Sequence, residues 1–215
     1  MQYLYYALLA VASYLLGCVS LSILMSKKMF GSDVRGMGSG NAGATNMARV
    51  FGLSAGVLTL IADAIKAAIA MFVGNLLFGE LGICIAGIAS LLGHCYPVFY
   101  GFKGGKGIAT SLGMILVISP VLALSLLAVE LVIVAVTRYM SLASISVTVA
   151  YPLLNIILFR GHENYGLFVF FSIVCGLLSL YCHRGNLMRL IRGEENRLDF
   201  KKISNLSRKL KGNKK

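Results

Sequence analysis

Seven residues in the middle of an apolar chain, Gly101–Gly107, read Gly-Phe-Lys-Gly-Gly-Lys-Gly. Glycine lets backbone N–H groups approach a ligand closely, and Lys103 and Lys106 add two ammonium groups. Apolar helical sequence resumes at Ile108, and a helix N-terminus favours anions through its unpaired N–H groups and its dipole. The pattern therefore predicts a phosphate-binding segment. Its glycine spacing and its lack of a Ser/Thr after the second lysine argue against a nucleotide-binding P-loop.

A second polar segment, residues 36–49, offers neutral hydrogen-bonding groups in the sequence GMGSGNAGATNMAR. Gly38, Gly40 and Gly43 form a GxGxxG pattern, but no strand precedes them, so dinucleotide binding is not expected. The remaining polar side chains suit a small, polyhydroxylated and phosphorylated molecule. They are Ser39, Asn41, Thr45, Asn46 and Arg49. The alternative is a polar turn whose arginine reaches the membrane interface.

Charged residues also interrupt an apolar segment. Asp63 and Lys66 lie three residues apart, on one face of a helix, at membrane depth. Intramembrane charges are costly and are usually paired or functional, so we expect an ion pair that either positions the helix or takes part in catalysis. His94, alone on an apolar helix, is expected to be a hydrogen-bonded structural residue.

Two pairs of polar residues follow towards the C-terminus. Ser141 and Ser144 share a helical face shortly after Arg138. This pair is weak evidence for function, because serines in membrane helices commonly bond to backbone or to another helix. His183 and Asn186 lie three residues apart at the end of the last apolar segment. A histidine beside a neutral amide can deprotonate a hydroxyl or donate to an oxyanion.

The composition explains why these polar segments are so distinct. Of the 215 residues, 58% are hydrophobic and 13% are charged, whereas soluble domains carry about 25% charged residues. Residues 184–215 contain eleven Lys/Arg and three acidic residues, a net charge of +8. A basic tail after a membrane helix is typical of contact with anionic cytoplasmic lipid, and few aromatics argue against nucleic acid. The five scattered cysteines indicate neither disulfides nor a zinc site.

The apolar segments predict an all-α membrane protein, a polytopic bundle of about seven transmembrane helices, with five or six as alternatives. The expected spans are 3–25, 51–78, 80–100, a stretch over 108–137 that Pro120 divides into two short helices, 141–159 and 165–181. Lys and Arg concentrate in alternate loops, so the N-terminus is expected outside and the C-terminus in the cytoplasm. Residues 1–185 form one expected catalytic domain, and residues 186–215 form a basic cytoplasmic tail that is not an independent domain.

Taken together, the motifs resemble one family, the bacterial acyl-phosphate:glycerol-3-phosphate acyltransferases, which are integral membrane enzymes of phospholipid synthesis. The resemblance covers nearly the full chain in the family's order, in the blocks Gly38–Arg49, Asp63–Lys66, Leu92–Thr110, Arg138–Ser144 and His183–Glu194. The GSGNxGATN and FKGGKG blocks are highly specific together. The chain departs from the family where Cys182 replaces the usual Arg or Lys and where Ala67 replaces Gly, and neither change removes a group assigned to chemistry.

The resemblance implies transfer of a fatty acyl group from acyl phosphate to the 1-hydroxyl of glycerol 3-phosphate, giving lysophosphatidic acid and phosphate. It assigns catalysis to His183, Asn186, Ser141 and Lys106. It assigns substrate binding to Ser39, Gly40, Asn41, Thr45, Asn46, Arg49, Lys103, Gly104, Gly105 and Gly107, with phosphate held by Arg49, Lys106 and the amides of Gly104 and Gly105. Supporting roles fall to Asp63, Lys66, Arg138 and Ser144.

The family also implies a setting for the reaction: the bacterial inner membrane, an active site facing the cytoplasm, no metal or other cofactor, no nucleic acid, and acyl phosphate supplied by a separate enzyme. An organophosphate transporter is the alternative, but the polar segments gather on one face and no inverted repeat is visible. A CoA-dependent acyltransferase with a His-x-x-x-x-Asp motif is disfavoured, because no histidine here has that spacing. Acyl-chain preference, oligomeric state and the identity of the general base stay open.

Overall fold

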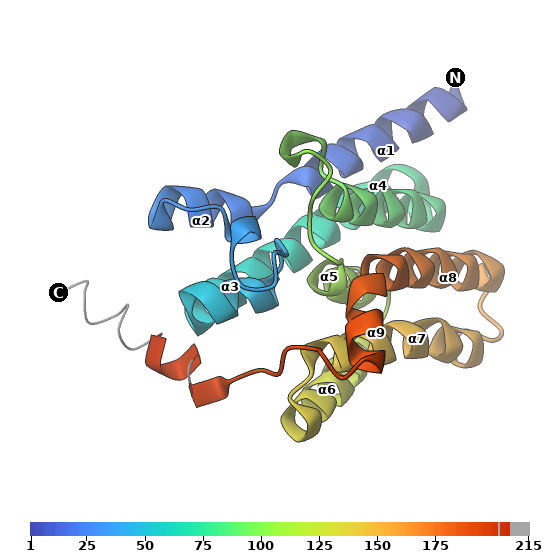
Figure 1. The fold of residues 1–215 in the computed structure, drawn as a ribbon. Coiled ribbons are helices and arrows are strands. Elements are labelled where there is room, and N and C mark those ends of the chain that lie inside the picture. The colour runs from blue at the N-terminus through green and yellow to red at the C-terminus, as the bar shows by residue number, and fades with distance from the viewer. Residues whose placement is uncertain (202, 207–215) are drawn as a thin grey trace.

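The computed structural model describes residues 1–201 and 203–206, and its regular structure over these residues is helical (Figure 1). The main helices are α1 (Gln2–Cys18), α2 (Leu21–Phe30), α3 (Ala44–Phe51), α4 (Leu53–Cys95), α5 (Ile108–Ile118), α6 (Pro120–Thr137), α7 (Met140–Leu158), α8 (Tyr165–Cys182) and α9 (Arg184–Ile191). Two 3₁₀ turns, Val34–Gly36 and Val98–Tyr100, lie in the loops. The expected all-α fold is confirmed. Residues 202 and 207–215, part of the expected basic tail, lie outside the described residues.

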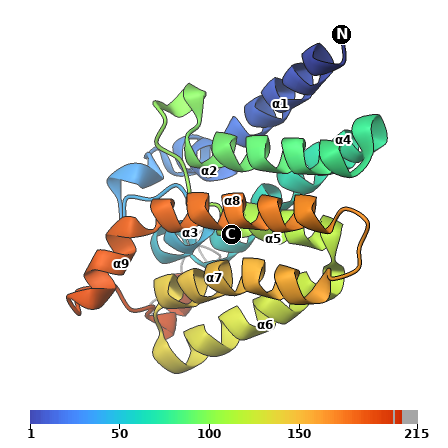
Figure 2. The same ribbon diagram turned by 90° about the vertical axis from the view of Figure 1, so that its right-hand side faces the viewer.

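Over the described residues, five helical segments are long and apolar enough to cross a membrane. They are Gln2–Phe30, Leu53–Tyr100, Pro120–Thr137, Met140–Leu158 and Tyr165–Cys182. The second of these reverses direction inside α4, where Gly79 has φ 59° and ψ −144°, a conformation open mainly to glycine. The expected boundary between spans 51–78 and 80–100 therefore corresponds to a chain reversal (Figure 2). α5, with 11 residues, is a shorter apolar helix, so a count of seven spans stays a prediction.

The expected first span, 3–25, is not one continuous helix. α1 ends at Cys18, and Ser20 begins α2, with its hydroxyl accepting from the backbone N–H of Ile23 at 3.5 Å. The break frees the carbonyl of Val19, which accepts a hydrogen bond from Lys66 Nζ at 2.8 Å. A buried ammonium group thus satisfies the carbonyl that the broken helix leaves without its usual partner.

The segment between the expected spans 3–25 and 51–78 is also partly helical. α2 continues to Phe30 and ends at Gly31 in the left-handed conformation, and α3 occupies Ala44–Phe51. Phe30 stacks on Phe51 with ring centroids 4.1 Å apart, which holds the ends of the two helices together. The sequence pattern missed these helical stretches because α3 has only eight residues, and helices this short depend on tertiary packing more than on local propensity.

The break expected at Ser119–Pro120 is confirmed. α5 ends at Ile118, and the hydroxyl of Ser119 caps α6 by accepting from the backbone N–H of Leu122 at 3.3 Å. Proline at the first position of a helix costs no hydrogen bond and favours the helical φ angle. α5 and α6 fold back on each other, as the sequence predicts.

α4 is the central element of the bundle, because it packs against α1, α3, α5 and α8. Small residues permit these close approaches, as is usual between membrane helices. A Cβ atom at Gly93 would collide with the backbone carbonyl of Tyr14 in α1, and one at Gly113 would collide with Ala64. The core beside α4 includes Met71, Leu91 and Phe171, all fully buried.

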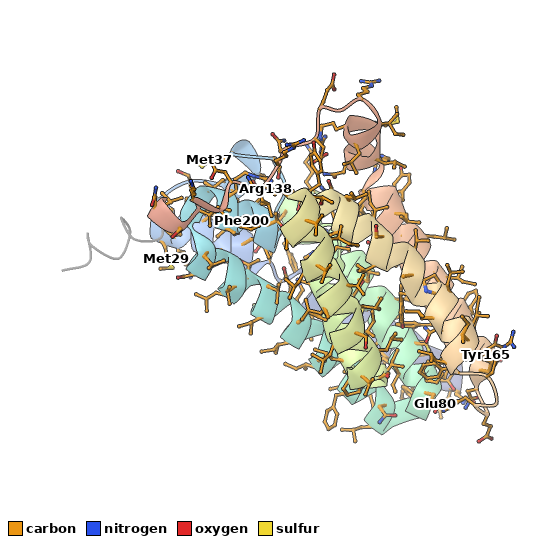
Figure 3. The ribbon with its side chains drawn as sticks, turned by 90° about the horizontal axis from the view of Figure 1, so that it is seen from below. Met29, Met37, Glu80, Arg138, Tyr165 and Phe200 are labelled. Carbon is orange, nitrogen blue, oxygen red and sulfur yellow. The ribbon has the colours of Figure 1, made fainter. Side chains whose placement is uncertain are left out.

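The loops richest in Lys and Arg gather at one end of the bundle, while the α7–α8 loop at the other end carries Arg160. Figure 3 places Met37 and Arg138 at this end, and Glu80 and Tyr165 at the opposite end. Arg35 joins two of the cation-rich loops, since its guanidinium donates to the carbonyl of Tyr100 at 2.7 Å and to that of Lys103 at 3.3 Å. The helices therefore bring polar segments that are distant in sequence to a single face.

The contact of α1 with α4 predicts a stability difference between two Gly→Ala substitutions. Gly93→Ala should lower the unfolding temperature in detergent by several degrees, because overpacking a close helix contact costs about 1–3 kcal/mol. Gly166→Ala, in α8, is the matched control, since a Cβ atom there meets nothing within 4 Å and alanine is the better helix former. Equal unfolding temperatures for the two variants would contradict the close packing of α1 on α4.

Candidate active site

A cleft with about 1090 Å³ of space, part of it open to the surroundings, lies at the cation-rich end of the bundle. Its walls come from segment 39–49, α4, the start of α5, α6, α7 and the α8–α9 junction. Twelve of the eighteen residues expected to form the site line it: Ser39, Asn41, Thr45, Asn46, Arg49, Asp63, Lys106, Gly107, Ser141, Ser144, His183 and Asn186. The fold thus brings together the four residues expected to be catalytic and most of those expected to bind substrate.

Six of the expected residues lie elsewhere. Gly40, Lys103 and Gly104 line a separate surface hollow beside Asp33 and Arg35, where the Arg35 guanidinium lowers the pKa of Asp33 well below its usual value. Gly105, Lys66 and Arg138 do not line the cleft.

The amides of Gly104 and Gly105 donate to the carbonyls of Cys95 and His94, each at 3.1 Å. These two amides, expected to hold phosphate, instead fasten segment 101–107 to the end of α4. Glycine is required at 105 because a Cβ atom there would collide with the His94 ring.

Lys106 and Asn186 form the central contact of the cleft. Lys106 Nζ donates to Asn186 Oδ1, while Asn186 Nδ2 donates to both carboxylate oxygens of Glu195, at 3.1 and 3.2 Å. Arg189 also binds Glu195, with Nε 3.0 Å from Oε2. Glu195 fixes the amide orientation and directs its oxygen towards the ammonium group. The sequence analysis missed this role, although Glu195 stands only nine residues after Asn186.

Burial and neighbouring charges perturb Lys106. Burial lowers its pKa to about 8, and the nearby Arg189 and Arg49 act in the same direction. Burial also lowers the pKa of Arg49, which stays charged because a guanidinium titrates far above neutral pH. Two partly desolvated cations in one cleft are what a phosphate dianion requires, because the charge interaction is stronger away from water.

His183 lies at the junction of α8 and α9, with 3% of its surface exposed. Its Nδ1 donates to the carbonyl of Ser179 at 2.9 Å, which fixes the proton on Nδ1. Burial, together with Lys106, lowers its pKa to about 4. The imidazole is therefore neutral at physiological pH, and its Nε2 is a hydrogen-bond acceptor.

Asp63, Lys66 and His94 form a buried network under the cleft. Lys66 Nζ lies 2.8 Å from Asp63 Oδ1 and 3.1 Å from His94 Nδ1, and His94 Nδ1 lies 3.4 Å from Asp63. The expected Asp63–Lys66 pair is thus present, and His94 joins it. Because the His94 carbonyl accepts from Gly105, the network also supports the segment that carries Lys106.

Asn46 organises the first polar segment. Its Nδ2 donates to the carbonyls of Met37 and Asn41, at 2.9 and 3.0 Å, and its Oδ1 accepts from the Ser39 amide at 2.9 Å. With 1% of its surface exposed, the side chain uses both of its N–H groups within its own loop. It shapes the loop that presents Ser39 and Asn41 to the cleft, a role that residue type alone does not reveal.

A carboxylate that the sequence analysis overlooked, Glu130 in α6, also lines the cleft. Its Oε1 accepts from Ser144 Oγ at 2.9 Å. Ser141, one turn before Ser144, has a buried hydroxyl without a partner among the described residues. A lone carboxylate inside an apolar helix was the available signal, since such residues are usually functional. Ser141 is left free to donate to a substrate oxygen.

Known proteins are similar to this chain over most of its length. A family model described as glycerol-3-phosphate acyltransferase matches residues 7–193. A glycerol-3-phosphate acyltransferase from Thermoanaerobacter sp. (strain X514) is 41% identical over 198 residues, 92% of this chain and 98% of that protein. The chain belongs to the glycerol-3-phosphate acyltransferase family.

Two solved structures share the fold. Both are crystal structures of PlsY (YgiH), an integral membrane glycerol 3-phosphate acyltransferase. The glycerol 3-phosphate form superposes with a TM-score of 0.82 at 41% identity, over 91% of this chain and 96% of that one. The lysophosphatidic acid form has a TM-score of 0.81 at 39% identity, over 93% and 98%. The chain is therefore an integral membrane protein of this family.

The pKa of Lys106 gives a pH dependence with a definite sign. Lys106 is charged below about 8 and neutral above it, so kcat/KM for glycerol 3-phosphate should fall as pH rises through about 8. Lys106→Arg should keep its charge, and its residual activity should not show this decline. Initial rates between about pH 6 and about pH 10 measure both profiles. The same alkaline midpoint in both proteins would exclude Lys106 as the titrating group.

Proposed function

We propose that this chain transfers a fatty acyl group from acyl phosphate to the 1-hydroxyl of glycerol 3-phosphate, giving lysophosphatidic acid and inorganic phosphate. The observation that carries the proposal is the Lys106–Asn186 contact, in a cleft that also holds Arg49 and a neutral His183. The cleft offers cations for phosphate, a free hydroxyl donor and an imidazole acceptor. These are the groups that transfer of an acyl group between a phosphate and a hydroxyl requires.

Phosphate recognition falls to Lys106 and Arg49. The guanidinium supplies a planar, forked set of donors and the ammonium supplies a compact charge. Gly107, which precedes α5 with φ 89°, directs the start of this helix and its positive dipole end into the cleft. Ser39, Asn41 and Thr45 line the same cleft and suit the hydroxyls of glycerol 3-phosphate.

The donor is a mixed anhydride, so the reaction proceeds by direct attack without a covalent enzyme intermediate. The acceptor hydroxyl oxygen forms an ester bond to the carbonyl carbon, and the bond between that carbon and the phosphate oxygen breaks. Negative charge develops on the carbonyl oxygen and on the departing phosphate. Ser141, whose hydroxyl has no partner in the described chain, donates to the carbonyl oxygen, and Lys106 stabilises the phosphate.

The proton of the acceptor hydroxyl has two available bases. His183 Nε2 accepts a hydrogen bond from the hydroxyl and orients it, but with a pKa of about 4 it is a weak base. A phosphate monoester, with a second pKa of about 6, is the stronger base. In this proposal a substrate phosphate oxygen takes the proton, and His183 positions the hydroxyl for attack.

The membrane arrangement follows from the same cleft. The cation-rich end, with Arg49, Lys106 and Arg138, faces the cytoplasm according to the positive-inside rule. With α4 as two antiparallel arms and α5–α6 as a folded pair, the described chain has seven apolar segments, which is consistent with an external N-terminus and a cytoplasmic C-terminus. The host membrane is the bacterial inner membrane, and a separate enzyme supplies acyl phosphate. Residues 1–185 form the membrane part of the catalytic domain, and the basic cytoplasmic tail after 185 contributes Asn186 and Glu195 to its cleft.

The donor can be tested directly with purified protein in detergent. Palmitoyl phosphate and labelled glycerol 3-phosphate should yield labelled lysophosphatidic acid, in the presence of EDTA, whereas palmitoyl-CoA should not. Lys106→Ala should reduce the rate on the order of 10²- to 10³-fold, because it removes a donor to the developing charge. Lys103→Ala is the matched comparison from outside the cleft. Efficient use of palmitoyl-CoA would overturn the donor assignment, and an equal loss for both lysines would overturn the cleft as the phosphate site.

Kinetic measurements can distinguish a catalytic role of His183 and Asn186 from a purely structural one. His183→Ala and Asn186→Ala should each lower kcat by about 10²-fold or more, because they act mainly in the transition state. The KM for glycerol 3-phosphate should change less. A rise in KM with normal kcat would instead indicate that the pair binds the acceptor phosphate. Normal specific activity, corrected for folded protein, would remove both residues from the mechanism.

A further inference from the structure

The helix α9 turns apolar side chains outward and a polar side chain inward. Leu187, Met188 and Ile191 are 46%, 48% and 72% exposed, and their spacing places them on one face of the helix. Asn186, on the opposite face, is buried. A helix whose outer side meets water has the reverse pattern, with its apolar residues towards the protein. The outer side of α9 is therefore suited to surroundings other than water.

The position of α9 indicates what those surroundings are. α9 begins directly after the junction residue that follows the apolar helix α8, and it bends away from the axis of α8 (Figure 2). Tyr181, in the last turn of α8, is exposed. The Arg184 guanidinium lies 4.2 Å from the centroid of the Tyr181 ring and donates to the Tyr181 carbonyl at 2.8 Å. Tyrosine and arginine at the end of a membrane helix are typical of the level of the lipid head groups.

The charge of α9 is complementary to an anionic surface. α9 and its C-cap residue Arg192 carry three arginines and no acidic residue. Arg189 is paired with Glu195, whereas Arg184 and Arg192 are exposed and form no ion pair with another described residue. Apolar side chains beside unpaired arginines match an anionic bilayer, which presents phosphate groups above apolar chains.

We call these outward-facing residues the outer face of α9: Arg184, Leu187, Met188, Ile191 and Arg192. We propose that the outer face binds an anionic lipid surface and that this contact keeps Asn186 in the cleft. The effect on the reaction rate rests on the proposed acyl transfer. The lipid contact itself rests on the exposure, the charge and the position of α9.

Contact with lipid would support a helix that has few partners in the bundle. Eight residues are too few for a helix that is stable by itself, and the main contacts of α9 are with α7 and α8. From the inner side, Asn186 Oδ1 accepts from Lys106, and His183 directly precedes the helix. A tilt of α9 would move Asn186 and His183 relative to Lys106. Apolar burial in lipid and arginine contacts with head groups oppose such a tilt.

The test measures amide hydrogen exchange of residues 184–192 in nanodiscs that hold one copy of the protein. Discs of phosphatidylglycerol should protect α9 about 10-fold or more relative to discs of phosphatidylcholine with the same acyl chains, because each arginine near an anionic surface contributes a factor of about 5. Replacing both arginines, Arg184→Gln with Arg192→Gln, should abolish this difference. Arg160→Gln is the matched control and should retain it, since Arg160 is exposed in the α7–α8 loop at the other end of the bundle.

The double variant Leu187→Gln with Ile191→Gln tests the apolar contact. Glutamine is about as good a helix former as leucine and a better one than isoleucine. If the outer face met water, protection of α9 would therefore stay the same or increase. Against lipid the variant loses apolar burial, and α9 should exchange about 10-fold faster or more in both kinds of disc.

Equal protection of wild-type α9 in the two lipids, or unchanged exchange in the Leu187/Ile191 variant, would overturn the lipid contact. Protection that appears only in discs with two copies would assign the outer face to a second chain and would also overturn it.

Activity in the same discs tests the coupling to the cleft. In both double variants kcat should fall where protection falls, while the KM for glycerol 3-phosphate changes less. An unchanged kcat despite lost protection would overturn the coupling to Asn186. If wild type transfers no acyl group in either lipid, the proposed function fails, and hydrogen exchange alone decides the lipid contact.

Discussion

The arrangement of the cleft depends on one buried charge, the ammonium group of Lys66. Its side chain is 8% exposed, and its partners come from three parts of the chain: Asp63, His94 and the carbonyl of Val19. Removing one member of such a network typically costs about 3–5 kcal/mol, because an uncompensated charge stays buried. The charge therefore requires the break between α1 and α2, which turns the chain towards segment 36–49. It also holds His94, whose carbonyl accepts from Gly105 and so fixes the segment that carries Lys106.

The charge distribution of the cleft depends on which of its cations are paired with a carboxylate. Arg189 is paired with Glu195, and that carboxylate is shared with Asn186. Lys106 contacts only the amide oxygen of Asn186 among the described side chains, and Arg49 forms no ion pair within residues 1–201 and 203–206. Neither cation thus forms a direct ion pair among the described residues, although the nearby Glu195 carboxylate favours the charged form of both. Burial nevertheless lowers the pKa of Lys106 to about 8. In the proposed reaction, a substrate phosphate between the two cations would offset this cost of burial.

Sequence reasoning succeeded where residue type and spacing determine the outcome. The all-α fold, the break at Pro120 and the Asp63–Lys66 pair all follow from local rules of helix geometry and burial. It failed where the outcome depends on hydrogen-bond partners that lie far away in the sequence. Asn46 was interpreted as a ligand donor, yet its amide is used within its own loop.

The break at Val19 had no local signal, because Ser20 lies in apolar sequence and the partner that stabilises the break is Lys66. Glu195 was overlooked for the same reason, because its role depends on its hydrogen bonds with Asn186. Glu130 did have a local signal, as a lone carboxylate in an apolar helix, but its partner Ser144 is visible only in the fold. The family resemblance predicted that these residues belong to one site, which their spacing in the sequence does not show. The resemblance did not reveal which of the residues face a ligand and which hold the loops in place.

In the proposed reaction, the position of the cleft serves two substrates of opposite solubility. Glycerol 3-phosphate is fully polar and needs access from water, whereas an acyl phosphate carries a chain that is stable only away from water. Helix ends satisfy both demands, because their loops can carry charge while their first turns already lie among apolar side chains. Glu130, whose carboxylate accepts from Ser144, lines both the charged cleft and an adjoining, mainly apolar space among α5, α6, α7 and α8. The carbonyl of the proposed donor belongs at such a boundary, and Ser141 and His183 line the cleft on its polar side.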